Sequence, residues 1–155
     1  MEAQDKLHLC TGGGLVATGG YAPKGGTGNV EQAKLALASG ADPGLNNPAR
    51  FGGATPFHWA CYMGHEELVL YLASRSDAER YTSRTDTVYG ETPFWSCCQN
   101  GRTHLAKVLL KGIPTSDLTK PRFKHQGGET PLLIAQNNGH VETAAWLQQV
   151  LLNDK

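Results

Sequence analysis

The sequence predicts an all-α fold in which short helix pairs stack into a solenoid. Three segments align with one another: GATPFHWACYMGHEELVLYLA from Gly53, GETPFWSCCQNGRTHLAKVLL from Gly90 and GETPLLIAQNNGHVETAAWLQ from Gly128. A fourth, partial copy precedes them, with LHLC at residues 7–10 and GNVEQAKLALASGAD from Gly28. Units of this length bury a continuous core only by stacking on their neighbours. We therefore expect one repeat domain that occupies the 155-residue chain.

Each complete unit begins with a Thr-Pro pair that predicts the start of a helix. The pairs begin at Thr55, Thr92 and Thr130. The residue before a proline is held in an extended conformation, and its hydroxyl can accept a hydrogen bond from the free N–H groups of the first turn. A glycine nine residues after each threonine predicts the helix end, because glycine adopts a left-handed conformation at little cost. We expect first helices of about eight residues.

A second amphipathic helix is expected directly after each of these glycines. Apolar residues recur there at spacings of one, three and four, which places them on one helix face. The expected faces are Leu68, Val69 and Leu72 in the second unit, Leu105, Val108 and Leu109 in the third, and Val141, Ala144, Ala145 and Trp146 in the fourth. Helices this short are unstable alone, so they must pack on neighbouring units.

These units resemble ankyrin repeats. The family pattern has a Gly-x-Thr-Pro-Leu-His-x-Ala-Ala helix start, a Gly-His turn, a Leu-rich second helix and a Gly-Ala-Asp exit; GATPFHWACYMGH carries the first part and ASGADP at residues 38–43 the exit. The resemblance covers roughly residues 5–150. It implies an ankyrin-type α-solenoid with hairpin-like finger loops, in units of approximately 1–48, 49–85, 86–123 and 124–155.

The connections between units are longer than the resemblance implies. The usual ankyrin unit has about 33 residues, whereas Gly28, Gly64, Gly101 and Gly139 lie 36, 37 and 38 residues apart. Because the helices have a fixed length, the extra residues must lie in LNNPARFG, SRSDAERYTSRTDTVYG and IPTSDLTKPRFKHQG. We therefore expect extended, irregular finger loops beside a concave groove.

The charge balance argues against nucleic acid and membranes as partners. The chain has 14 basic and 14 acidic residues and no run of either sign, whereas nucleic acids and anionic membranes select clustered Lys and Arg. No segment approaches the roughly 20 apolar residues that span a bilayer, and the start lacks the pattern of a secretory leader. These features predict an intracellular, cytoplasmic protein, with a nuclear location also open.

Four cysteines and two histidines are the candidates for chemical sites. Cys61 and Cys98 occupy equivalent places in successive units, and Cys10 and Cys97 the place before, where the family usually has alanine; buried thiols behave as small apolar groups, so packing explains all four. The adjacent pair Cys97-Cys98 leaves a redox switch as an alternative. His58, Cys61 and His65 have metal-like spacing, but Gly64 interrupts the helix between them, so we expect no metal and no cofactor.

The glycine-rich stretch TGGGLVATGGYAPKGGTGN at residues 11–29 invites a nucleotide-site interpretation. Lys24 precedes Gly25 instead of following the last glycine, and no three glycines between residues 12 and 28 have Gly-x-Gly-x-x-Gly spacing. Both phosphate-binding patterns therefore fail. We interpret residues 12–27 as an insertion between the two helices of the first unit, with Leu15, Val16 and Tyr21 available to cover the array or a partner.

The repeat register indicates where a partner would bind. The resemblance to ankyrin repeats implies that the variable positions lie in the finger before each Thr-Pro pair and at the two residues before the closing glycine. They hold the predicted partner-binding residues Phe51, Tyr62, Met63, Val88, Tyr89, Glu91, Gln99, Asn100, Asn137 and Asn138. Large apolar residues that stacking does not require mark a binding surface.

The expected function is a non-catalytic protein–protein interaction module, either a small adaptor or an accessory subunit of a larger complex. No Gly-x-Ser-x-Gly or His-Glu-x-x-His motif indicates catalysis. The alternatives are a transient assembly chaperone and, less favoured, a nucleotide- or redox-dependent switch that uses the glycine-rich insertion or Cys97-Cys98.

Overall fold

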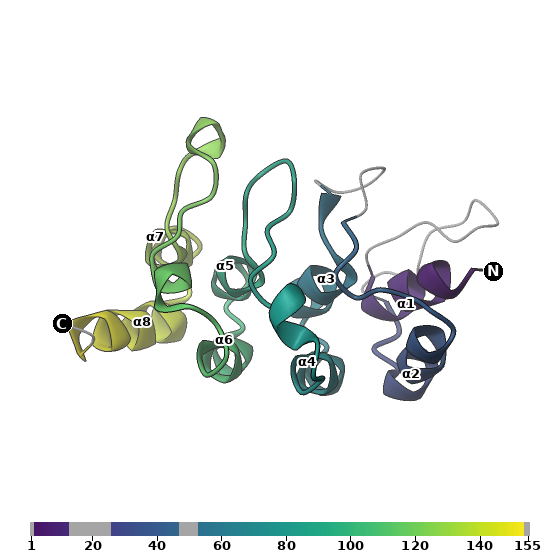
Figure 1. The fold of residues 1–155 in the computed structure, drawn as a ribbon. Helices are drawn as coiled ribbons and strands as arrows, with labels where there is room; N and C mark the ends of the chain where they lie inside the picture. Colours follow the sequence, from purple (N-terminus) through teal and green to yellow (C-terminus); the bar gives the residue numbers. More distant parts are fainter. Residues whose placement is uncertain (1, 13–25, 47–52, 154–155) are drawn as a thin grey trace.

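A computed structural model describes residues 2–12, 26–46 and 53–153. Eight α-helices form four successive pairs: α1 (Ala3–Thr11) with α2 (Val30–Ala38), α3 (Pro56–Met63) with α4 (Glu66–Ala73), α5 (Pro93–Gln99) with α6 (Thr103–Leu110), and α7 (Pro131–Asn137) with α8 (Val141–Asn153). Figure 1 shows the first helices of the pairs in one row, the second helices in a parallel row and the loops projecting beyond the first row. The described residues contain no strand. The all-α solenoid predicted from the sequence is confirmed.

The Thr-Pro pairs cap the helices as the sequence predicts. The side-chain oxygens of Thr55, Thr92 and Thr130 accept hydrogen bonds from the backbone N–H three residues later, at 3.0, 3.0 and 3.2 Å. Each following proline occupies the first turn of its helix. Proline removes no bond there, because the first N–H groups of a helix have no partner within the helix.

The closing glycines are required by the backbone and by their neighbours. Gly64 ends α3 with φ of 78°, and Gly101 follows α5 with φ of 67°. A Cβ on Gly101 would lie 2.5 Å from Nδ1 of His140 in the next unit, and one on Gly64 would lie 2.7 Å from the guanidinium carbon of Arg102. Each of these glycines therefore lets a side chain of the following unit pack directly on the backbone.

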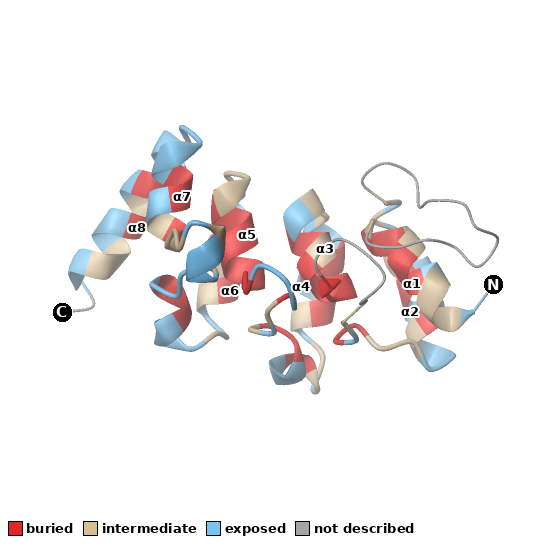
Figure 2. Ribbon diagram, turned by 90° about the horizontal axis from the view of Figure 1, so that it is seen from above, coloured by how far each residue is buried: buried red, intermediate tan, exposed pale blue. Residues whose placement is uncertain are grey.

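The core lies between the two rows of helices, as Figure 2 shows by its buried residues along α3 and α5. Its largest fully buried side chains are Trp95, Tyr81, Phe57 and Phe94. The rings of Phe57 and Tyr81 pack at 5.1 Å, and the Tyr81 hydroxyl donates to the Leu72 carbonyl. Tyr81 comes from the connection after α4, so that loop is part of the core.

The predicted buried faces of the second helices hold for α4 and need correction for α6 and α8. Leu68, Val69 and Leu72 are fully buried in α4, and in α6 Ala106 is buried where Val108 is only half-buried. In α8 the prediction of Val141 and Ala145 is wrong, since both are exposed. The buried residues of α8 are Thr143, Ala144 and Leu147. Thr143 faces inward because its hydroxyl bonds the hydroxyl of Thr103 at 2.7 Å.

The connections form finger loops, which we define as residues 81–92 and 119–130. Each loop is closed by one backbone bond of hairpin type, from Asp86 N–H to the Glu91 carbonyl at 3.1 Å and from Arg122 N–H to the Glu129 carbonyl at 3.2 Å. The two fingers are joined by a 2.7 Å bond from Phe123 N–H to the Tyr89 carbonyl. The expected fingers are therefore present as irregular loops that support one another.

Polar contacts between successive units recur at a separation close to one repeat. Arg84 bonds Asn46 at 2.5 Å, Asn100 donates to the Tyr62 carbonyl at 3.4 Å, and Asn138 donates to the Gln99 carbonyl at 2.9 Å. These bonds fix each unit on the one before it, because an amide aimed at a backbone carbonyl tolerates only a narrow range of positions.

The glycine-rich insertion leaves and rejoins the first unit at one place. Gly28 N–H donates to the Cys10 carbonyl at 2.9 Å, and Thr27 N–H donates to the Leu9 carbonyl at 3.1 Å. The predicted roles of Leu15, Val16 and Tyr21 lie outside the described residues.

Candidate partner-binding pocket

A pocket of about 360 Å³ opens beside the finger loops, where residues of α3, α5 and both fingers meet. Its wall residues come from two successive units, with Arg122 in the finger that leads to the next unit. They are Ala54, His58, Trp59, Tyr62, Asp86, Tyr89, Glu91, Gln99 and Arg122. The pocket therefore exists only because the units stack in register.

Asp86 shapes one wall of the pocket through bonds to its own finger. Its Oδ1 accepts from the backbone N–H groups of Val88, Tyr89 and Gly90, and its Oδ2 accepts from Glu91 N–H at 3.0 Å. Four donors on one buried carboxylate fix the finger tip, because charge-assisted bonds are stronger than neutral ones. This arrangement sets the positions of Tyr89 and Glu91 at the pocket.

Glu91 is a buried carboxyl group, and among the described residues its one cationic partner, Arg122, also binds Glu129. Glu91 is 9% exposed, and its Oε1 lies 3.5 Å from Nη1 of Arg122, whose Nε bonds Oε2 of Glu129 at 2.7 Å. Burial, and then the neighbouring Asp86, raise the pKa of Glu91 to about 7, while Arg122 acts in the opposite direction. The Arg122 bond holds the pKa of Glu129 below its usual range. Arg122 thus stabilises the ionised form of Glu129 more than that of Glu91.

His58 contributes a neutral imidazole to the pocket. Its Nε2 lies 2.5 Å from the Ser96 hydroxyl. Burial lowers the pKa of His58 to about 4, against a smaller opposing effect of Asp86. Within the part of the chain that the structure describes, His58 Nδ1 and Gln99 Oε1 have no hydrogen-bond partner. Two buried polar atoms at this pocket are therefore available to a ligand.

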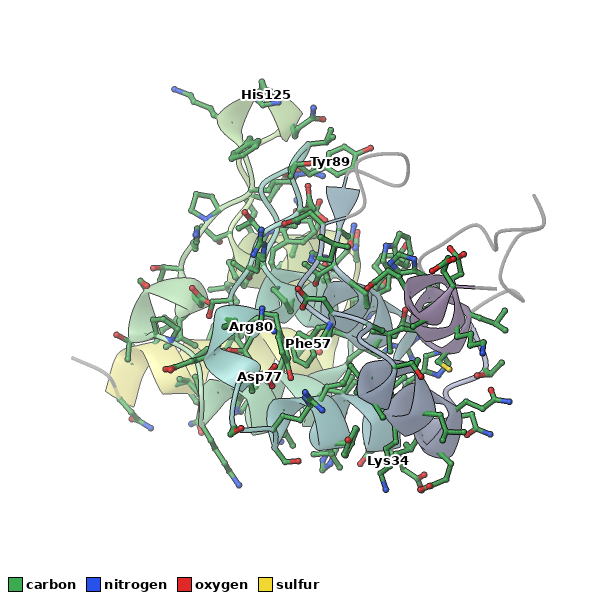
Figure 3. The ribbon with its side chains drawn as sticks, turned by 45° about the vertical axis from the view of Figure 1, so that its right-hand side comes forward. Lys34, Phe57, Asp77, Arg80, Tyr89 and His125 are labelled. Carbon is green, nitrogen blue, oxygen red and sulfur yellow. The ribbon has the colours of Figure 1, made fainter. Side chains whose placement is uncertain are left out.

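Aromatic side chains form the rim. Tyr62 and Tyr89 are 36% and 38% exposed, and the rings of Trp59 and Tyr62 pack edge to face with centroids 5.3 Å apart. Figure 3 shows Tyr89 high among the finger loops, above the level of Phe57 in the core. The rim thus offers aromatic surface to solvent beside a polar interior.

Four of the residues predicted from the sequence meet at this pocket. They are Tyr62, Tyr89, Glu91 and Gln99. Met63 and Val88 are adjacent to them in sequence but do not line the cavity; Val88 is exposed at the finger tip, and the Met63 carbonyl accepts from Arg102 at 3.2 Å.

The remaining predicted residues lie elsewhere. Asn100 and Asn138 bond carbonyls of the preceding unit and so serve the stacking, and Asn137 is exposed at the end of α7. Phe51 lies outside the described residues.

The sequence did not indicate His58, Trp59, Asp86 and Arg122 as pocket residues. In the sequence His58 has metal-like spacing with Cys61 and His65. Among the described groups it lies instead beside Asp86 and Glu91, and the possible ligand atoms of these three residues lie within 4.8 Å of one another. The one local sign of the role of Asp86 is its position four residues before Gly90 in the finger. Arg122 reaches the pocket from a separate finger, and nothing local in the sequence predicts that.

The comparison with known families agrees with the helix pairs. A family model described as ankyrin repeats, in three copies, matches residues 21–121. This chain belongs to the ankyrin repeat family. Ankyrin repeats generally mediate protein–protein interactions, and the family is typically non-catalytic. In the described part of this ankyrin repeat protein, no helix combines the length and apolar character needed to cross a membrane.

The four cysteines of this ankyrin repeat protein lie in the core. All four are unpaired and buried. Burial raises the pKa of the thiols of Cys10, Cys61 and Cys98, which disfavours the thiolate that reacts with oxidants and disulfides. Their environment is that of small apolar core residues.

Proposed function

We propose that this chain is a non-catalytic interaction module, a small adaptor or accessory subunit of a larger protein complex, formed by a single repeat domain over residues 1–155. It binds a protein partner at the pocket and the finger loops. The observation that carries the proposal is the meeting of Tyr62, Tyr89, Glu91 and Gln99, from two successive units, at one cavity.

The rim has the composition of an interface centre. Tyrosine and tryptophan dominate the binding energy of protein interfaces, because they bury a large area while their polar ends find partners. Tyr62 and Tyr89 expose more than a third of their surface. A partner side chain that enters the cavity would be surrounded by residues held in place by the fingers.

A site-specific cross-linking experiment tests this proposal. A photoreactive phenylalanine analogue is placed at Tyr62, and in a matched control at Leu35, which is 69% exposed on α2. We expect a distinct protein adduct from position 62 and not from position 35. Equal adducts from both positions, or none from position 62, would contradict the proposed site.

The partner identified in this way is then titrated against purified variants. Tyr62→Ala combined with Tyr89→Ala should weaken binding at least about tenfold, a loss of roughly 1.4 kcal/mol. The melting temperature should change little, because both side chains are partly exposed. Leu35→Ala combined with Val141→Ala removes exposed apolar groups outside the pocket and should leave binding unchanged.

A further inference from the structure

The pocket presents several hydrogen-bond acceptors. Asp86 and Glu91 contribute carboxyl groups, and Gln99 Oε1 is a buried acceptor with no partner among the described residues. His58 Nδ1 is a second acceptor in the tautomer in which Nε2 carries the proton and donates to Ser96. A ligand that fits this pocket must therefore bring several donors.

The charges of the pocket point the same way. Two carboxyl groups and one guanidinium line the pocket, and Arg122 makes its shorter ionic contact with Glu129, with its guanidinium carbon 5.3 Å from the centre of the Trp95 ring. The 3.5 Å contact with Glu91 is weak by comparison. Because burial raises the pKa of Glu91 to about 7, a cation that reached this carboxyl group would relieve an uncompensated burial cost.

The rim suits a cation carried on an apolar stem. Trp59, Tyr62 and Tyr89 stand at the cavity that Asp86 and Glu91 also line. Long basic side chains bury their methylene groups against such surfaces while the charged end reaches polar groups. Aromatic faces also attract the cation itself, by roughly 0.5–2 kcal/mol.

We propose that this pocket binds the basic side chain of a lysine or arginine in the protein partner, with the charged end at Glu91 and Gln99 and the stem between the aromatic residues of the rim. This inference rests on the proposed function, since it names the chemistry that enters the same site.

A bound metal ion is the competing occupant of the same carboxyl groups. Three groups, His58, Asp86 and Glu91, place possible ligand atoms within 4.8 Å of one another. However, both oxygens of Asp86 already accept backbone N–H bonds, and Arg122 contributes a positive charge that would repel a divalent ion. A monovalent side chain with its own N–H donors meets neither obstacle to the same degree.

The test uses short peptides and the whole chain. Acetyl-Gly-Arg-Gly-amide and acetyl-Gly-Lys-Gly-amide are titrated by NMR at pH 7.5, with the indole N–H of Trp59 and the amide N–H groups of Tyr62 and Glu91 as reporters. We expect saturable shifts at these positions with a Kd of about 1 mM. The citrulline peptide, which keeps the shape of arginine without its charge, should bind at least about tenfold more weakly.

Matched variants connect the shifts to the pocket. Glu91→Gln should weaken the arginine peptide at least about tenfold. Glu142→Gln makes the same change on the exposed first turn of α8 and should have no effect. A melting curve of each variant shows that it is folded, and the comparison of the arginine and citrulline peptides on the unaltered chain holds even if Glu91→Gln is not.

Three results would overturn the inference: equal binding of the arginine and citrulline peptides, no shift at the three reporters, or saturable binding of Zn²⁺ alone at micromolar concentration. If a partner cross-links at position 62 while the basic peptides leave the reporters unmoved, the proposed function stands and this inference fails. If the peptides bind and position 62 captures no protein, the proposed function fails instead.

Discussion

His58 Nε2 and the Ser96 hydroxyl lie 2.5 Å apart, and both residues are buried. The bond joins α3 of one unit to α5 of the next. Through this bond Nε2 has a partner, whereas Nδ1 of the same ring has none among the described residues. A buried polar ring with a single bond depends strongly on that bond, because an unpaired buried group keeps its desolvation cost.

Ser96→Ala should therefore destabilise the fold by about 1–3 kcal/mol, the cost of leaving a buried polar group unpaired. Ser74→Ala is the control, since the Ser74 hydroxyl donates to the Tyr71 carbonyl at 2.7 Å in an exposed position. The control should cost less than about 0.5 kcal/mol. Urea unfolding curves measure both; equal losses would show that the His58 contact contributes nothing special.

The shifted pKa values of His58 and Glu91 should cancel in the pH dependence of stability. Burial lowers the pKa of His58 from 6.5 to about 4 and raises that of Glu91 from 4.5 to about 7. Between about pH 4.5 and 6.5, unfolding makes His58 take up a proton and Glu91 release one. The His58 shift alone would lower the free energy of unfolding as pH falls, and the Glu91 shift alone would lower it as pH rises. Together the two shifts leave the free energy of unfolding nearly independent of pH in this range.

Glu91→Gln should expose the effect of His58. The stability of this variant, relative to the unaltered chain, should fall as pH drops from about 6.5 to 4.5, by up to about 1.4 kcal/mol per pH unit. Urea unfolding at several pH values measures the difference. Parallel pH profiles of the two proteins would show that the pKa shift of Glu91 is not coupled to folding.

Three glycines offer a graded test of the stacking. Gly101→Ala must adopt a positive φ and displace the His140 ring; Gly139→Ala has the same strain at φ of 75° but no described heavy atom within 4 Å of its Cβ; Gly112→Ala has neither problem. Left-handed strain costs about 1–2 kcal/mol, so we expect the loss of stability to be largest at Gly101, intermediate at Gly139 and absent at Gly112. Equal losses at Gly101 and Gly139 would exclude a role for the His140 contact.

The buried thiols should react only after unfolding. Cys61, Cys97 and Cys98 have no exposed surface and Cys10 is 1% exposed. A disulfide reagent at pH 8 should label none of the four quickly in the native protein and all four in denaturant, because access and thiolate formation both limit the reaction. Fewer than four reactive thiols in freshly purified, denatured protein would instead favour a redox role for Cys97-Cys98.

A shortened insertion should leave the array folded. The backbone bonds of Thr27 and Gly28 to the end of α1 hold the two ends of the insertion together. Deleting residues 15–25 leaves Gly13 and Gly14 as a link, and the change in loop length should alter stability by no more than about 1 kcal/mol. The helical circular dichroism and the melting temperature measure the outcome; loss of the folding transition would show that the insertion belongs to the core.

The helices could be predicted from the sequence because their signals are local. A threonine before a proline caps its own helix, and a glycine nine residues later ends it, whatever surrounds them. The exposed side of α8 was predicted wrongly because the apolar character of Val141 and Ala145 does not by itself determine whether another element covers them; both are exposed. The inward position of Thr143 depends on a hydroxyl 40 residues away.

The residues that line the pocket could be predicted only in part, because only some of them are set by the repeat pattern. Tyr62, Tyr89, Glu91 and Gln99 follow from the repeat register, which places equivalent positions along one groove. The position of Arg122 depends on how the second finger packs on the first, through the bond between Phe123 and Tyr89. Asn100 and Asn138 occupy variable positions and bond the preceding unit, so a variable position can also contribute to the stacking of the units.

The stacking of the units also sets the order in which the molecule opens. α5 contacts α3, α7 and α6, whereas α8 contacts only α7 and α6 among its stronger neighbours. Loss of α5 breaks contacts with first helices on both sides, as does loss of α3, whereas loss of α8 breaks contacts on one side. Amide hydrogen exchange should therefore be slowest in α5 and faster in the helix pairs toward both ends. The outer pairs would then unfold locally while the inner pairs remain folded.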